Sequence, residues 1–237
     1  MTHVPKSKSV QAHEKKPETL SQELQDLLHP NITGLIIVDV QKGYFSAPNS
    51  PLAQLTGAST THLEKAAYKI NDFIENSRKY NLASIVFARM EENPEVMSSN
   101  FAAKMRRRGT PALTKKGEES YEYFVVSPQE SDKEIEKILY SSFEGTDLHE
   151  HLQEKGIKTV IIIGGYGSVC VDATAQSAAN KGYNVFIPHD LVADLDTPEN
   201  GSETDELSAF MHRFRKIYGE TPSSHAILST WENTSQT

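Results

Sequence analysis

Residues 159–174 read TVIIIGGYGSVCVDAT, and this stretch decides the fold. A short β-branched run at 159–163 is followed by glycines and then by an alanine-rich amphipathic segment, which predicts a strand, a tight turn and a helix. The turn carries Cys170, the single cysteine of the chain. We therefore expect the thiol at or near a helix N-terminus, where backbone N–H groups and the helix dipole stabilise an anion.

Cys170 has two interpretations at this point. A lone cysteine is often a small buried core residue. A thiol at a helix N-terminus, in contrast, is expected to have a lowered pKa and to be a more available nucleophile. A core cysteine does not need a glycine-rich turn at the end of a strand, so we interpret Cys170 as a nucleophile.

The rest of the chain continues the alternation of strands and helices. Further apolar runs predict strands at 35–38, 83–88, 183–188 and 225–229, short extended segments at 121–126 and 135–140, and helices at 61–74, 146–155, 170–181 and 202–218. Residues 91–120 show no clean periodicity, which is typical of a functional lid or a mobile loop. The pattern predicts an α/β fold: a three-layer α-β-α domain around a mostly parallel, doubly wound central sheet. Active sites of such sheets lie beyond the carboxyl ends of the strands.

Composition narrows the class of protein. A chain of 237 residues holds one large α/β domain or at most two small ones. The net charge of -8 argues against a nucleic-acid surface. No apolar stretch approaches the roughly 18 residues needed to cross a bilayer, so we expect no membrane partner. A single cysteine excludes an intramolecular disulfide framework and fits a reducing compartment, which predicts a cytoplasmic protein.

The ends of the chain are polar. We expect residues 1–17 to form a disordered tail, residues 18–229 to form the domain, and residues 230–237 to form a second polar tail.

Two charged residues, Asp39 and Lys137, are candidates for catalytic roles. Asp39 directly follows the strand at 35–38, where partial desolvation makes a carboxylate a candidate base; the alternative is a cap of the next turn. Lys137 lies in an extended segment, where a solvated edge lysine is the ordinary explanation.

Other residues are candidates for a pocket. Tyr44 and Phe45 form an aromatic wall or simply pack in the core. Arg89 binds a substrate carboxylate bidentately or ends its strand in solvent. The basic run 106–108 is a solvated face or guides an anionic substrate to the mouth of the site.

Three motifs in this order resemble the isochorismatase-like cysteine hydrolase superfamily, which includes nicotinamidases and N-carbamoylsarcosine amidases. They are Asp39-x-Gln41 after the first strand, Lys137 shortly before the segment 141–148, and the glycine-rich cysteine turn at 164–171. The resemblance covers about residues 33–229. In that family the strand after the cysteine helix usually ends in Asp, and Asp190 occupies that place here.

The resemblance implies a site. Asp39, Lys137 and Cys170 would form the catalytic triad, and the backbone N–H groups of Tyr166 and Cys170 would form the oxyanion hole. Substrate contacts would come from Gln41, Tyr44, Phe45, Arg89 and Gly165, and the Gly165–Tyr166 peptide bond would be cis. The partner implied is a small-molecule substrate, and the family also implies a homo-oligomer, either a dimer or a tetramer.

No metal or other cofactor is expected. The nicotinamidases of the family carry an Asp-x-His pair and further histidines that hold a metal, whereas residues 46–50 read SAPNS. The expected function is therefore cysteine-dependent hydrolysis of a small amide, ureide or carbamoyl compound through a thioester.

Three alternatives stay open. One is an isochorismate-type vinyl ether hydrolase, which uses the Asp, and another is a non-catalytic member that binds small molecules or acts as a scaffold. The third is a dinucleotide-binding domain, because Gly165-x-Gly167 follows a strand and opens a helix. In that fingerprint a third glycine would stand where this chain has Cys170.

Overall fold

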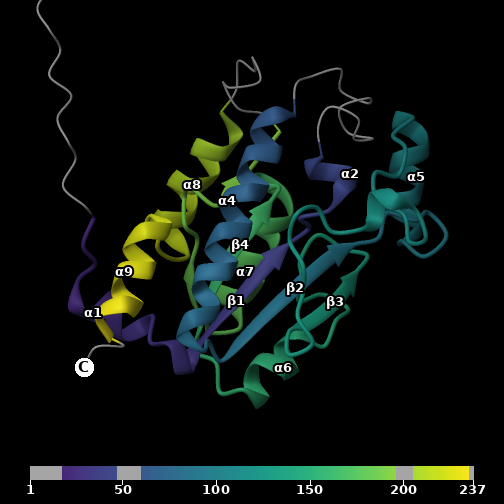
Figure 1. The fold of residues 1–237 in the computed structure, drawn as a ribbon. Coiled ribbons are helices and arrows are strands. Elements are labelled where there is room, and N and C mark those ends of the chain that lie inside the picture. Colours follow the sequence, from purple (N-terminus) through teal and green to yellow (C-terminus); the bar gives the residue numbers. More distant parts are fainter. Residues whose placement is uncertain (1–17, 47–59, 196–204, 235–237) are drawn as a thin grey trace, which may run out of the picture.

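The computed structural model of the chain describes residues 18–46, 60–195 and 205–234. These residues contain a six-stranded sheet with the order β3-β2-β1-β4-β5, in which β6 pairs with β4 and every pairing is parallel (Figure 1). The strands are β1 (Thr33–Val38), β2 (Ser84–Met90), β3 (Lys133–Lys137), β4 (Thr159–Gly165), β5 (Asn184–Phe186) and β6 (Val192–Ala193).

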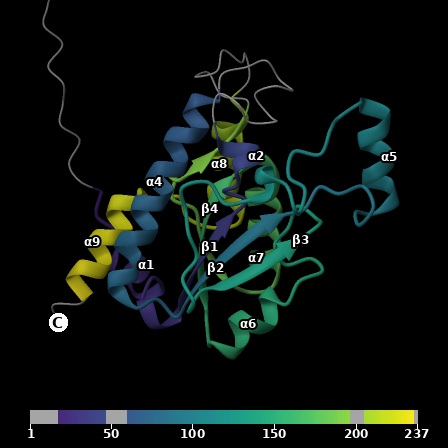
Figure 2. The same ribbon diagram turned by 45° about the vertical axis from the view of Figure 1, so that its right-hand side comes forward.

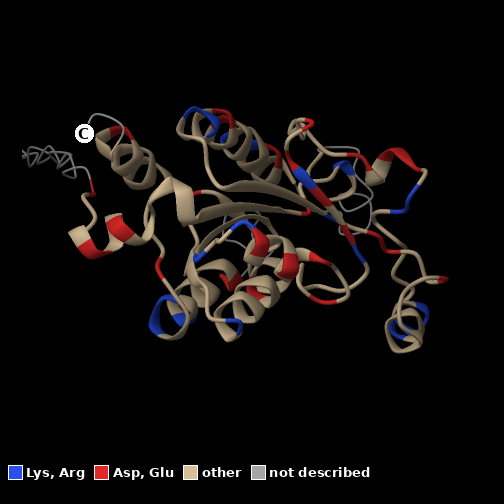
Figure 3. Cartoon of the chain, turned by 90° about the horizontal axis from the view of Figure 1, so that it is seen from below, with Lys and Arg blue, Asp and Glu red and all other residues tan. Residues whose placement is uncertain are grey.

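Helices cover both faces of this sheet (Figure 3). They are α1 (Gln22–Leu27), α2 (Lys42–Phe45), α4 (Thr61–Ser77), α5 (Ser99–Arg108), α6 (Leu148–Glu154), α7 (Asp172–Asn180), α8 (Glu206–Ile217) and α9 (Ser224–Thr234). Alternate residues of β1 point to opposite sides: Leu35 and Ile37 pack with α4 and α9, whereas Ile36 and Val38 pack with α6, α7 and α8. Both faces of the strand are buried, as expected for a parallel sheet between helical layers. The predicted fold class is confirmed.

The structure corrects the C-terminal end of the domain. The predicted strand at 225–229 and the start of the predicted polar tail at 230 both lie in the helix α9. Ala226, Ile227, Thr230 and Trp231 are its buried residues, a helical spacing that a short apolar run did not distinguish from a strand. Trp231 is fully buried, and its indole N–H donates to the carbonyl of Leu28 at 2.7 Å. Residues 230–234 therefore belong to the folded domain.

The middle of the chain also departs from expectation. Residues 121–126 form no strand and contribute only an isolated bridge between Tyr123 and Gln41. The extended segment expected at 135–140 runs from 133 to 137 instead. The irregular region 91–120 contains α5, which ends at Arg108 and projects beyond the carboxyl ends of β2 and β3 (Figures 1 and 2). The expected tail 1–17 and the expected helix start at 202 lie outside the described residues.

Strand register brings four chain segments together at one edge of the sheet. Val38 at the end of β1 pairs with Ala88 on one side and with Gly164 on the other. Met90 at the end of β2 pairs with Lys137 at the end of β3. Side chains that follow β1 and β4 therefore face those that end β2 and β3. Within the described residues, the helices are all too short or too polar to pass through a bilayer.

Candidate active site

Asp39 and Lys137 form a buried ion pair at this edge. The Lys137 ammonium donates to Asp39 Oδ2 at 2.7 Å, and the two side chains are 0% and 1% exposed. Asp39 has a φ of 54°, a left-handed conformation that only Gly, Asn and Asp adopt readily. The chain thus turns away from the direction of β1 at Asp39 itself. Backbone outliers of this kind cluster at functional sites.

The two oxygens of Asp39 have different environments. Oδ2 is held by Lys137, whereas Oδ1 is buried without a hydrogen-bond partner among the described residues. Burial raises the pKa of Asp39, and it outweighs the opposing effects of the Lys137 charge and of the hydrogen bond from Lys137. Oδ1 is therefore the oxygen that is free to accept a proton.

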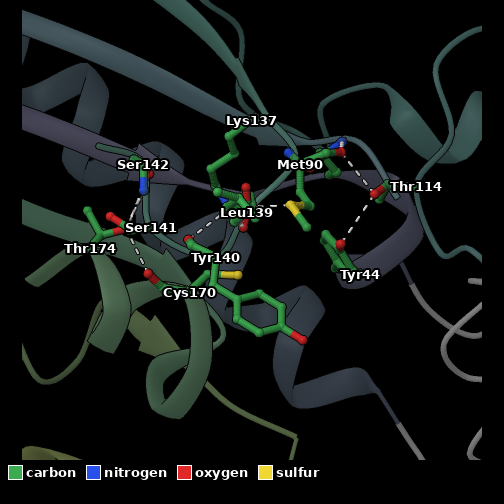
Figure 4. Close-up of polar contacts among 12 residues, drawn as sticks. Tyr44, Met90, Thr114, Lys137, Leu139, Tyr140, Ser141, Ser142, Cys170 and Thr174 are labelled. Carbon is green, nitrogen blue, oxygen red and sulfur yellow. Dashed lines mark hydrogen bonds and ion pairs between the residues drawn. The ribbon is translucent and has the colours of Figure 1, made fainter. Parts of the chain in front are cut away.

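The ammonium of Lys137 is enclosed by acceptors. It also donates to the carbonyls of Tyr140 at 3.1 Å and Leu139 at 3.3 Å, and it lies 3.7 Å from the sulfur of Met90 (Figure 4). Burial alone lowers the pKa of Lys137, but the charge of Asp39, the hydrogen bond to it and the interaction with Cys170 raise that pKa above its ordinary value. The lysine therefore stays protonated. The solvated edge lysine that the sequence left open is excluded.

Cys170 lies in a tight turn directly before α7. This turn is one of π-helical geometry at Gly167–Val171, and the Gly165–Tyr166 peptide bond that precedes it is cis. Gly164 has a φ of 121°, and a Cβ there would lie 2.1 Å from the Val38 carbonyl oxygen. A Cβ on Gly165 would lie 2.8 Å from Cζ of Phe45. The glycines thus let the cysteine turn approach the end of β1 and the aromatic ring behind it.

The pKa of the thiol differs from the expectation. Burial raises the pKa of Cys170 well above its ordinary value, and the nearby Asp39 charge raises it further, while the Lys137 charge acts in the opposite direction. The helix N-terminus was expected to lower this pKa, but desolvation is the larger effect in this buried site. The resting thiol is therefore protonated and needs a base when it attacks.

Two side chains that the sequence analysis did not assign to the site, Thr174 and Ser141, hold the cysteine turn against the segment that follows β3. Thr174 Oγ1 donates to the carbonyl of Cys170 at 2.7 Å and accepts from the backbone N–H of Ser142 at 3.0 Å (Figure 4). Ser141 Oγ donates to Ser177 Oγ at 2.9 Å. These bonds tie α7 to the loop that begins at Lys137, so they set the distance between the lysine and the thiol.

Two acidic residues follow β5, Asp190 in the loop and Asp194 after β6, and they have different partners. Asp190 accepts from the backbone N–H and the hydroxyl of Ser224, so it supports the start of α9. Asp194 is buried and accepts from the backbone N–H of Ser168 in the cysteine turn. The backbone carbonyl of Asp194 forms a hydrogen bond with Nε2 of His62 in α4. Nothing in the sequence distinguishes the two carboxylates, because the path of the loop after β5 decides which one reaches the turn.

Two of the predicted substrate-binding residues have partners within the protein. Gln41 is fully buried; its amide donates to the carbonyls of Met90 and Tyr121, and its Oε1 accepts from the Met90 N–H. Its side chain joins the segments after β1 and β2 and uses both N–H donors of its amide in doing so. Arg89 pairs with Glu134 at 3.0 Å and stacks on the rings of Tyr121 and Tyr123. These contacts use one nitrogen of its guanidinium, and a substrate contact of Arg89 stays a prediction.

The predicted aromatic residues lie beside the triad. Phe45 is fully buried and stacks on Tyr166, whose ring also meets that of Tyr44 edge to face. The hydroxyl of Tyr44 donates to Glu92 Oε1 at 2.9 Å. Tyr166 Oη is buried and has no hydrogen-bond partner among the described residues. The aromatic wall therefore also carries polar groups close to the site.

Glu92 is a further acidic residue that the sequence analysis missed. Its Oε2 accepts from the Leu113 N–H at 2.7 Å. Burial raises the pKa of Glu92, more than the hydrogen bonds from Leu113 and Tyr44 lower it. Its place two residues after β2, at the carboxyl edge of the sheet, is the signal that could have identified it.

The described residues contain no group of three or more His, Cys, Asp or Glu side chains arranged to hold a metal ion. The absence of a metal from the reaction stays a prediction.

Comparisons with known proteins agree with this architecture. The family model described as "Isochorismatase domain" matches residues 33–218. The uncharacterized isochorismatase family protein YddQ of Bacillus subtilis is 28% identical, over 83% of this chain and 98% of its own. Ureidoacrylate amidohydrolase RutB of Acinetobacter baylyi is 23% identical over 88% of this chain and 87% of its own.

A solved structure adds the likeness of the fold. N-carbamoylsarcosine amidase from Thermoplasma acidophilum superposes with a TM-score of 0.64 at 25% identity, covering 81% of this chain and 96% of that one. The resemblance noted in the motifs is thereby confirmed over most of the chain. This chain belongs to the isochorismatase family and is a hydrolase of that family.

Proposed function

We propose that this chain hydrolyses a C–N bond of a small amide, ureido or carbamoyl compound, with Cys170 as nucleophile, Asp39 as general base and acid, and Lys137 as the group that keeps Asp39 charged. The observation that carries this proposal is the difference between the two oxygens of Asp39. Oδ2 is held by Lys137 at 2.7 Å, whereas Oδ1 is buried and has no hydrogen-bond partner among the described residues. A base for a thiol needs one such oxygen.

The first half of the reaction forms a thioester. Asp39 Oδ1 takes the proton of the Cys170 thiol while Sγ attacks the carbonyl carbon of the substrate. The raised pKa of the thiol makes this proton transfer necessary. The backbone N–H groups of Tyr166 and Cys170 would stabilise the oxyanion. Asp39 then gives the proton to the nitrogen, the C–N bond breaks, and ammonia or an amine leaves.

The second half returns the enzyme to its starting state. Asp39 accepts a proton from water as the water oxygen attacks the thioester carbon. The C–S bond breaks, the acid is released, and the proton returns to Cys170. Lys137 holds the carboxylate in one orientation throughout, and its positive charge stabilises the thiolate that develops beside it.

The test begins with labelling. Cys170 is the only cysteine, so iodoacetamide should add one label per chain and abolish turnover. A screen of primary amides, ureides, carbamoyl compounds and isochorismate, scored by ammonia or product release, should give activity with a C–N substrate in the wild type. The Cys170→Ala variant should fold with an unchanged circular dichroism spectrum and have no such activity.

Other outcomes select the alternatives. Activity on isochorismate that survives Cys170→Ala but not Asp39→Asn would establish ether hydrolysis driven by the carboxylate. A labelled but inactive protein that binds compounds of the panel would indicate a non-catalytic member. By the same resemblance we propose a cytoplasmic homo-oligomer, for which light scattering of the purified chain should give the mass of a dimer or tetramer.

A further inference from the structure

A second cavity lies at the amino ends of β2 and β3, the edge of the sheet opposite the candidate active site (Figure 1). Its volume is about 520 Å³, which falls within the range of ~300–1,000 Å³ of small-molecule sites. Residues 78 and 81–85 line it from the end of α4 to the start of β2, residues 129 and 131–133 from the segment that enters β3, and residues 151 and 155 from the end of α6. The cavity is therefore separate from the triad.

The charged side chains that line this cavity are three cations and one carboxylate. The cations are Arg78, Lys133 and Lys155, and the carboxylate is Asp132. The side chain of Asp132 is 3% exposed, and its two oxygens accept from Arg78 at 3.1 and 2.8 Å. Lys133 pairs at 2.6 Å with Asp147, which does not line the cavity. The lining thus has an excess of positive charge, although the net charge of the chain is -8.

Lys155 is the cation of this cavity that has no acidic partner. It is exposed and forms no ion pair with the residues that the structure describes. As the C-cap of α6 it interacts favourably with the helix dipole. The dipole of α6 does not account for Arg78 and Lys133, because they come from other elements and face the same space.

His151 lies between the cations of two elements. Burial and the charges of Lys133 and Lys155 lower the pKa of His151, and the charges of Asp147 and Glu154 oppose this effect only in part. The ammonium groups of β3 and α6 therefore act on the same imidazole ring. An anion bound beside them would have the opposite effect and raise that pKa.

Neutral polar side chains complete the lining. The hydroxyl of Ser84 lies 2.8 Å from Nε2 of His151. The side chains of Asn81, Gln129 and Ser131 form no hydrogen bonds within the described part of the chain, so their donors are available. Amide and hydroxyl groups together with lysine and arginine are the side chains that bind phosphate oxygens in proteins.

We propose that this cavity binds a tetrahedral dianion, a phosphate or sulfate group that is either free or carried by a small molecule, between His151, Lys155 and the start of β3. Leu82 and Ile85 add apolar surface that fits a small organic group. A ligand at this edge of the sheet is not positioned to react with Cys170, so the site is independent of the proposed cysteine chemistry.

The test is isothermal titration calorimetry of the full chain with sulfate and with phosphate, at constant ionic strength. We expect saturable binding of one anion per chain. Lys155→Gln should weaken this binding about threefold to fivefold, the size expected for losing one exposed charge interaction. Lys158→Gln is the matched control, because it removes the same charge from an exposed position outside the cavity. It should leave the affinity unchanged.

A second measurement uses the pH dependence of sulfate binding, because sulfate keeps both charges between pH 6 and pH 8. An anion that raises the pKa of His151 must itself bind more tightly when this residue is protonated. The wild type should therefore bind sulfate about threefold more tightly at pH 6 than at pH 8. His151→Asn should remove this pH dependence.

Phenyl phosphate distinguishes the two sources of the anion. Binding that is tighter than that of inorganic phosphate would assign the site to an esterified phosphate, whereas equal affinities would assign it to the free ion.

Three results would overturn the anion site. The first is the absence of saturable binding by either anion, and the second is equal affinity for sulfate in the wild type and in Lys155→Gln. The third is protection of Cys170 from iodoacetamide by sulfate in both of these proteins, because that would place the anion at the triad.

Discussion

Lys137 Nζ lies 2.7 Å from Asp39 Oδ2, and the pair is buried at the carboxyl ends of β3 and β1. Such a pair gains little net stability, because desolvation of both charges opposes their attraction. Each partner is nevertheless necessary for the other, since removing one leaves an uncompensated charge in the interior. Substitution of either residue should therefore reduce both kcat and the free energy of unfolding.

Replacement of Lys137 by Met should reduce kcat at least about a hundredfold, as expected when a general base loses its orientation and charge balance. The variant should also lose about 3–5 kcal/mol in free energy of unfolding, because the Asp39 carboxylate stays buried without its partner. Asp39→Asn should give a comparable loss of kcat. Denaturant unfolding and steady-state kinetics measure both effects.

Lys133→Met is the control on the same strand, because Lys133 forms a largely solvent-facing pair with Asp147. It should cost less than about 1 kcal/mol and leave kcat unchanged. Equal effects of the Lys133 and Lys137 substitutions on kcat would contradict the role of Lys137.

The raised pKa of the Cys170 thiol predicts a loss of stability at alkaline pH. In the unfolded chain the thiol has its ordinary pKa of 9.0 and loses its proton above that pH, whereas the folded thiol keeps its proton. Unfolding therefore releases a proton in this range, and stability falls as pH rises. Between pH 8 and pH 10, the free energy of unfolding of the wild type should fall by about 1.4 kcal/mol more than that of Cys170→Ala.

Thermal melts of the two proteins between pH 7 and 10 measure this difference. A loss of that size lowers Tm by about 3–6 °C in a domain of this length. Cys170 also contributes to the raised pKa of Lys137, so the difference between the two proteins reports the coupled titration of Cys170 and Lys137. Stability curves that stay parallel over the whole range would show that the folded thiol ionises normally.

Asp194 should act as a positioning residue for the cysteine turn. Asp194→Ala removes the acceptor of the Ser168 N–H and should lower the rate of Cys170 alkylation and kcat about tenfold or more, following the typical cost of a lost charge-assisted hydrogen bond. Asp194→Asn keeps an acceptor oxygen and should restore most of the activity.

Asp190→Ala provides the comparison, because Asp190 caps α9 and does not reach the turn. It should lower Tm and leave the alkylation rate unaltered. If both alanine variants change only Tm, Asp194 has no influence on the thiol.

Catalysis should continue after removal of metal ions. The proposed mechanism assigns the nucleophile, the base and the oxyanion donors to the chain itself, so that a Lewis acid has no step to perform. Prolonged treatment with a strong chelator should leave kcat unchanged, and elemental analysis of the active protein should find no stoichiometric zinc, iron or manganese. Activity that is lost on chelation and restored by one of these ions would require metal ligands not recognised in the sequence.

The sequence by itself determined the fold class, the central strands β1 and β4, and the order of the functional segments along the chain. The apolar runs of β1 and β4 are continuous, because both faces of a parallel strand are buried, and a continuous run can be recognised without knowing its neighbours. The glycines before Cys170 mark a turn by their conformation alone, and the place of Asp39 after β1 follows from the strand's end.

Only the tertiary structure decided what each polar side chain contacts. Arg89 and Glu92 are close neighbours in the chain, yet Arg89 pairs with Glu134, whereas Glu92 accepts from Tyr44 beside the site. In the same way, Asp190 binds the start of α9, whereas Asp194 binds the cysteine turn. The pKa of Cys170 likewise depends on burial by distant segments, which outweighs the local effect of a helix N-terminus. Local sequence determines conformation over a few residues, whereas desolvation and hydrogen bonding depend on segments up to about a hundred residues apart, such as Asp39 and Lys137 with a separation of 98.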